Sequence, residues 1–241
     1  MVPRTHASGV GPALNALPFS FAPNLGQTDP RVKFLARSGA MTLFLTSTET
    51  VFVTTRCAVR MRLVGANPES EAQGMDPLPG RQHSLVGRDP SRWHTDVPTY
   101  ARVRYRNVYR GIDVLYYGAA GRQLEYDFVV APGADPGAIR LAFDGVDRLA
   151  LEESGDLVLR VGETHIRFGK PRVYQMTAGG RRHVAGAWTF DDASTVRFRL
   201  GTYDSREPLV IDPTVAVATY LGGSGTDQAF AVALEIGRAH V

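Results

Sequence analysis

The chain has 241 residues, of which 44% are hydrophobic and 21% are charged. This is the composition of a soluble globular protein, and it excludes a disordered or collagen-like chain. The formal net charge is only +3, and the arginines are scattered among carboxylates rather than gathered in a run. We therefore expect no nucleic-acid partner, because nucleic-acid surfaces need clustered basic charge.

The cysteine and histidine content excludes several kinds of metal site. Cys57 is the only cysteine, so neither an intramolecular disulfide nor a cysteine-ligated zinc site can form. The six histidines show none of the short spacings that metal sites use, and we expect no metal and no cofactor. No segment approaches the roughly 18 consecutive apolar residues of a membrane span, so none is expected.

Short segments of alternating apolar and polar residues dominate the chain and predict strands of about five residues. They lie at 32–37, 41–46, 50–54, 59–63, 101–106, 112–117, 124–130, 139–143, 149–151, 156–161, 165–168, 172–176, 184–190, 195–200 and 209–211. Turn residues recur about every 8–12 residues, the spacing of a β-sandwich. We predict an all-β fold, an antiparallel sandwich-like module of one or two layers.

Residues 65–98 break this pattern, because Gly, Pro, Asn, Asp and Ser recur along them. Such residues favour turns over strands. We expect a long irregular connection here, joining two halves of the module.

Two carboxylates raise the question of catalysis. Glu125 and Asp127 are two residues apart on a predicted strand, so they share one face. Paired carboxylates suit glycoside hydrolysis, which makes a carbohydrate-active enzyme one alternative. However, Arg102, Arg104 and Arg106 form an equally regular stripe on a strand that we expect to be the neighbour of the carboxylates' strand. We expect cross-strand ion pairs between the two stripes and no enzymatic activity.

Aromatic residues are concentrated between positions 93 and 126. Exposed rings near Asp and Asn can stack on sugars, so a carbohydrate-binding module is a second alternative. The candidate ligand-binding residues are Trp93, Tyr100, Tyr105, Tyr116 and Tyr117. Core packing is the competing interpretation, since strand alternation places Tyr116 and Tyr117 on opposite faces.

Five segments, taken together and in this order, are similar to a known family. They read FAPNLGQTD (21–29), YRGIDVLYYG (109–118), LEYDFVVAPGADP (124–136), PLVIDP (208–213) and TYLGGSGTD (219–227). The chain resembles, over residues 17–234, the uncharacterised β-rich domain that precedes SBBP-type β-propeller repeats in large bacterial secreted or cell-surface proteins. It departs from the family pattern around 82–85.

The resemblance implies a non-catalytic structural or binding module at an extracellular or cell-surface location. It implies a downstream β-propeller of the same chain as a partner, with an extracellular glycan or protein as a further one. It carries over no catalytic residues.

The resemblance also suggests boundaries within the chain. We expect an unstructured segment at 1–16, the sandwich-like module at 17–213 and the incomplete first propeller repeat at 214–234. A single repeat cannot bury its apolar face without neighbours. The last residues, 235–241, can be back-translated into a sequence like a common sequencing-adapter oligonucleotide, so we expect them to be non-native.

Overall fold

The computed structural model describes residues 20–38, 41–85, 87–118, 124–177 and 179–218. The segments expected at 1–16 and 235–241, and all but the first five residues of the expected propeller repeat, lie outside this part of the chain. The described residues form an all-β structure with antiparallel pairing throughout, as predicted.

The fold is built from nineteen strands in the described residues, with two short 3₁₀ turns, η2 (Pro90–Arg92) and η3 (Pro136–Ala138). The strands are β1 (Phe21–Pro23), β2 (Phe34–Ser38), β3 (Met41–Leu45), β4 (Glu49–Val53), β5 (Ala58–Leu63), β6 (Glu71–Ser84), β7 (His94–Tyr109), β8 (Ile112–Gly118), β9 (Leu124–Val130), β10 (Arg140–Asp144), β11 (Arg148–Leu151), β12 (Leu157–Val161), β13 (Thr164–Phe168), β14 (Arg172–Thr177), β15 (Gly180–Val184), β16 (Gly186–Phe190), β17 (Thr195–Leu200), β18 (Leu209–Asp212) and β19 (Thr214–Ala218).

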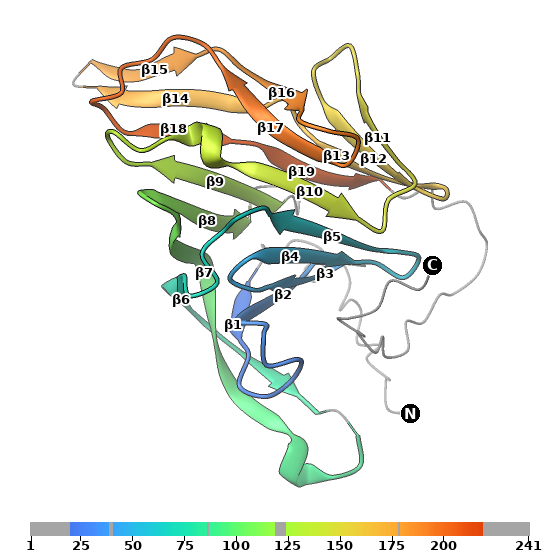
Figure 1. Ribbon diagram of the computed structural model, residues 1–241. Helices are drawn as coiled ribbons and strands as arrows, with labels where there is room; N and C mark the ends of the chain where they lie inside the picture. Colours follow the sequence, from blue (N-terminus) through green and yellow to red (C-terminus); the bar gives the residue numbers. More distant parts are fainter. Residues whose placement is uncertain (1–19, 39–40, 86, 119–123, 178, 219–241) are drawn as a thin grey trace, which may run out of the picture.

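The strands form two layers that are joined at β1 (Figure 1). The first layer runs β1–β2–β3–β4–β5–β10–β17–β16. The second runs β7–β8–β9 and then forks, because β18 and β19 lie one after the other along β9. One branch continues to β14 and β15, and the other to β13, β12 and β11. Phe21 of β1 is opposite both Ala36 of β2 and Tyr100 of β7, which makes the sheet continuous.

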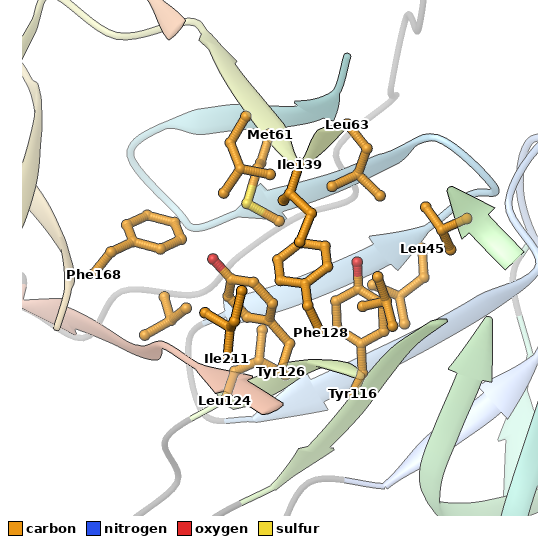
Figure 2. Close-up of a cluster of buried hydrophobic side chains, with 14 of the residues drawn as sticks. Leu45, Met61, Leu63, Tyr116, Leu124, Tyr126, Phe128, Ile139, Phe168 and Ile211 are labelled. Atoms are coloured by element: carbon orange, nitrogen blue, oxygen red, sulfur yellow. The ribbon is translucent and has the colours of Figure 1, made fainter. Parts of the chain in front are cut away.

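The space between the layers is filled by one large apolar cluster. Figure 2 shows side chains from both layers meeting there, among them Met61 of β5 and Phe128 of β9. The Phe168 ring makes edge contacts with Phe52 and Phe143, at centroid distances of 6.0 and 5.2 Å. Alternation along each strand directs these residues inward, so the sequence pattern accounts for the filled interior.

The open side of this nearly closed sheet is sealed by β16. Trp188 of β16 packs edge-on against Phe168, and its indole Nε1 donates a hydrogen bond of 2.9 Å to the carbonyl of Gly169. Gly186 approaches the second layer so closely that an added Cβ would lie 2.4 Å from a methyl group of Val173. The sheet is therefore close to a barrel whose lumen is occupied by its own side chains.

The connection expected at 65–98 is instead mostly regular structure, which corrects the sequence interpretation. β6 pairs with β7 from His94 to Arg106, and the hairpin projects from the body as a two-stranded arm, defined here as residues 71–100 (Figure 1). The Pro and Gly residues that suggested a loop lie on β6, which pairs only with β7 among the described strands. Edge strands tolerate such residues and use them to block further pairing.

A second, smaller apolar cluster fixes the arm to the body. It joins Val97 of the arm to Ala22 of β1 and Leu35 of β2, with Phe44 of β3 packed against them. Ala22, Leu35 and Val97 are all buried. The base of the arm therefore has a defined position.

Residues 214–218, assigned from the sequence to the start of a propeller repeat, form β19 inside this sheet. Val215 pairs with Leu124 of β9 on one side and with Phe168 of β13 on the other. The described module thus extends past the boundary expected at residue 213.

Candidate functional site

The outer face of the second layer carries the carboxylates singled out in the sequence. In β9, Leu124, Tyr126 and Phe128 are buried among the core residues, so Glu125 and Asp127 share the outer face. This confirms the predicted strand and its alternation.

A third carboxylate joins them from β18. Ile211 pairs with Phe128, and Thr214 pairs with Glu125 in the same register. That register places Asp212 directly opposite Asp127 across the strand pair. Like charges in such positions repel each other, so two ionised carboxylates here are costly. We call Glu125, Asp127 and Asp212 the carboxylate cluster.

Burial and mutual repulsion favour the protonated forms of Asp127 and Asp212. Asp127 is only 8% exposed, and burial, reinforced by the charge of Asp212, raises its pKa to about 7. The Tyr117 hydroxyl opposes this by donating a hydrogen bond of 3.1 Å to Asp127 Oδ1. Burial and the charge of Glu125 raise the pKa of Asp212 as well. Near neutral pH Asp127 therefore gains and loses its proton.

Basic and aromatic groups border the cluster on β14 and β15. Arg172 pairs with Asp212 across β14 and β18, and its charge lowers the pKa of that carboxyl. Arg181 lies over the Tyr174 ring, 4.1 Å from its centroid, and also lowers the pKa of both Asp127 and Asp212. A cation over an aromatic face is attracted to it, so this ring face is occupied.

Sequence reasoning missed Asp212, Tyr174 and Arg181. The available signal was the alternation of 209–212, which puts Val210 and Asp212 on one face at the end of an apolar strand. The partner strand was not deducible, because β9 and β18 are about 80 residues apart along the chain.

The expected pairing of the carboxylates with the arginine stripe is wrong. β8 lies between β7 and β9, so the two stripes are not neighbours. The arginines instead have other partners: Arg102 with Asp76, Arg104 with Asp113 and Arg106 with Gln73. The Arg104 Nε to Asp113 Oδ2 distance is 2.9 Å.

Two of the five candidate ligand-binding aromatics lie in the core. Tyr105 is 1% exposed and Tyr116 is 3% exposed, and their rings are in edge contact at 5.9 Å. The Tyr116 hydroxyl is also satisfied internally, 2.8 Å from Thr50 Oγ1. Neither ring is available to a ligand on the surface.

The other three lie in separate places. Tyr117 contacts Asp127 on the outer face of β8. Tyr100 packs edge-on against Phe34, with its ring directly over Gly74, where an added Cβ would lie 2.6 Å away. Trp93 is at the far end of the arm and is exposed. The five aromatics therefore do not form one binding face.

The described residues contain no group of three or more His, Cys, Asp or Glu side chains arranged to hold a metal ion. In the same part of the chain, no helix has the length and apolar character needed to cross a membrane.

Sequence comparison identifies the family. The family described as "Domain of unknown function (DUF7948)" matches residues 21–214. The chain belongs to this family. The match begins at β1 and ends at the first residue of β19, so it spans both layers and the arm. Neither a curated protein nor a solved structure matches the chain significantly.

Proposed function

We propose that this domain is a non-catalytic structural or binding module of a bacterial secreted or cell-surface protein, adjoining a β-propeller of SBBP-type repeats. The arm is its contact element. The sequence resemblance supports the location and the propeller. The filled interior supports a role carried by outer surfaces, because side chains occupy the lumen in which small barrels hold ligands.

The observation that carries the proposal is the apolar end of the arm. Leu85 is 56% exposed and Trp93 is 39% exposed, although both are large apolar residues. The described residues from Gly87 to Trp93 are held by local hydrogen bonds: Asp89 Oδ1 accepts a hydrogen bond of 3.0 Å from the Ser91 amide at the start of η2. The Trp93 indole donates to the Gly87 carbonyl at 3.2 Å. Exposed Trp on an ordered support is typical of interface hot spots.

Paired surface substitutions test this role. The full chain and the double variant Leu85→Ser/Trp93→Ser are applied to an array of neutral and acidic glycans and to the separately produced downstream propeller. We expect at least about tenfold weaker binding to the recognised surface in the variant, since hot-spot residues contribute about 2 kcal/mol or more. Thermal stability should be unchanged.

Leu151→Ser is the matched control, because Leu151 is also an exposed leucine but lies on β11 of the body. Equal binding by the double variant and this control would contradict the proposed role of the arm.

A carbohydrate-active enzyme is the second candidate, favoured by the pKa of Asp127 near 7 beside Asp212. Such a pKa suits a general acid or base at neutral pH. A panel of chromogenic glycosides tests it, and we expect no hydrolysis above the blank. Hydrolysis that is abolished in Asp127→Asn, with folding retained, would establish the enzyme instead.

A further inference from the structure

A pocket of about 520 Å³ lies where the arm meets the body. On the body side it is lined by Ser20, which directly precedes β1, and by Arg37 of β2. The arm contributes Thr99 and the segment 78–83. Its volume is in the range of small-molecule sites. It is separate from the carboxylate cluster and from the exposed end of the arm.

A β-bulge shapes the arm side of this pocket. Leu78 pairs with Thr99, but Arg81 pairs with Pro98, so Pro79 and Gly80 are extra residues on β6. The hydroxyl of Thr99, which is buried, donates a hydrogen bond of 2.6 Å to the Gly80 carbonyl and holds the bulge in place. Bulges redirect side chains and are frequent beside functional sites.

The pocket is also fixed in width. The small cluster of Ala22, Leu35 and Val97 holds the arm against β1 and β2. Leu35 is two residues from Arg37 on the same strand, and Val97 is two residues from Thr99. Both walls are thereby anchored through neighbouring residues, so a ligand would meet a largely preformed site.

The polar groups at the pocket are mainly donors. Arg37 and Arg81 supply guanidinium groups. The Nδ1 atom of His83 accepts a hydrogen bond of 3.2 Å from the Asp96 amide, so the neutral ring carries its proton on Nε2 and donates from there. Within the described residues, Arg37 has no ion-pair partner.

One carboxylate lies close enough to compete. Asp96 Oδ1 is 3.8 Å from Arg81 Nε, and both side chains are at least half exposed. A pair that is so exposed and so long is weak, so an anionic ligand can displace it. Arginine also binds carboxylate and sulfate groups through paired donors, which a single lysine cannot offer.

From these observations we propose that the pocket binds the anionic group of an acidic saccharide. The arginines and His83 hold a carboxylate or a sulfate, while Gln82 and Ser20 are polar partners for hydroxyl groups. Leu78 and Pro79 offer an apolar surface to a sugar ring. This inference rests on the proposed binding role and specifies its ligand class.

Calorimetric titration of the full chain tests the proposal. The probes are tri-galacturonate for the carboxylate, a sulfated disaccharide for the sulfate and maltotriose as the neutral sugar. We expect binding of at least one acidic probe and none of maltotriose. Arg81→Gln and Arg37→Gln should each weaken binding about tenfold, as expected for a lost hydrogen bond to a charged group.

Two further variants keep the result interpretable. Asp96→Asn should strengthen binding a few-fold, because it removes the competing charge; Asn also tolerates the positive φ of +59° at this position. Arg110→Gln removes an equal charge from the exposed turn between β7 and β8, at the other end of β7, and should leave affinity unchanged.

Two outcomes would overturn the proposal: no binding of either acidic probe, or equal loss in Arg81→Gln and Arg110→Gln. Neither outcome removes the proposed function itself, because neutral glycans or the propeller can still bind the arm through Leu85 and Trp93. The pocket proposal and the proposed function would both be contradicted if neither acidic probe bound and if the Leu85→Ser/Trp93→Ser variant bound the glycan array and the propeller no differently from the parent chain.

Discussion

The body and the arm use β-structure in opposite ways. In the body, strands are short and regular, and each buries one face against the other layer. In the arm, the strands are long, most side chains are at least partly exposed, and the pairing is interrupted by bulges. Two of the three non-glycine residues with positive φ in the described chain, Asp76 and Asp96, lie there. Apolar packing therefore determines the body more than the arm, whose side chains are mostly left accessible to solvent.

The largest effect is expected in the body. Phe168→Ala removes a ring that contacts Phe52, Phe143 and Trp188, and should lower the free energy of unfolding by about 3–5 kcal/mol. Denaturant titration measures this loss. Leu151→Ala, at an exposed site of the body, should cost far less, and equal losses would show that the layers do not share one core.

The carboxylate cluster gives the body an unusual pH response. The pKa of Asp127 is about 7 in the folded chain, against an ordinary value of 3.8 for an aspartate, so the folded state retains a proton that the unfolded state loses. Stability should therefore be highest below about pH 4 as far as this group is concerned, fall as the pH rises towards 7, and then level off.

Asp127→Asn tests this response, because the amide oxygen still accepts from Tyr117 while the charge is gone. A pKa raised by about three units corresponds to a loss of about 4 kcal/mol in the free energy of unfolding once the carboxyl is ionised. We expect the Asn variant to recover roughly half of this loss, because its amide hydrogens also need hydrogen-bond partners. Melting temperatures at pH 5 and pH 8 should then differ less than in the parent chain. An unchanged difference would mean that the protonation of Asp127 does not change between these two pH values.

A smaller gain is expected from Tyr126→Phe. The Tyr126 hydroxyl is buried and has no hydrogen-bond partner among the described residues. Removing such a group relieves its desolvation cost, so stability should rise by about 1 kcal/mol or stay level. If stability instead fell by more than about 1 kcal/mol, a bound water or another partner at this hydroxyl would be indicated.

The smallest effect on stability is expected at the end of the arm. Trp93→Ala should change the free energy of unfolding by no more than about 0.5 kcal/mol, because the residue is substantially exposed. Calorimetry checks this value. A larger loss would show that Trp93 stabilises the arm itself, and the distinction between a stabilising body and a recognising arm would need revision.

Strand positions in the body were predictable because apolar and polar residues alternate there with the period of a strand. The segments 41–46, 112–117 and 124–130 all correspond to strands with inward and outward residues as expected. One predicted strand, 184–190, is divided between β15 and β16, since Ala185 is not in a strand.

The arm and the pairing of distant strands were not predictable in the same way. Pro77, Pro79 and Gly80 are turn formers locally, and only the pairing of β6 with β7 shows that they lie on an edge strand. Likewise, Asp212 meets Asp127 because β18 returns to β9, which no local pattern encodes. Tyr105 and Tyr116 were ambiguous for the same reason, because alternation separates two faces without saying which is buried.

The positions of β1 and β19 have a mechanical consequence. These are the first and last described strands along the chain, and each has a neighbour on both sides. β1 lies between β2 and β7, and β19 lies between β9 and β13. A tensile load applied along either strand meets pairing on both sides, a longer ladder on one side and a contact of one or two residue pairs on the other. Both ends of the described domain should therefore resist being pulled out along the chain direction.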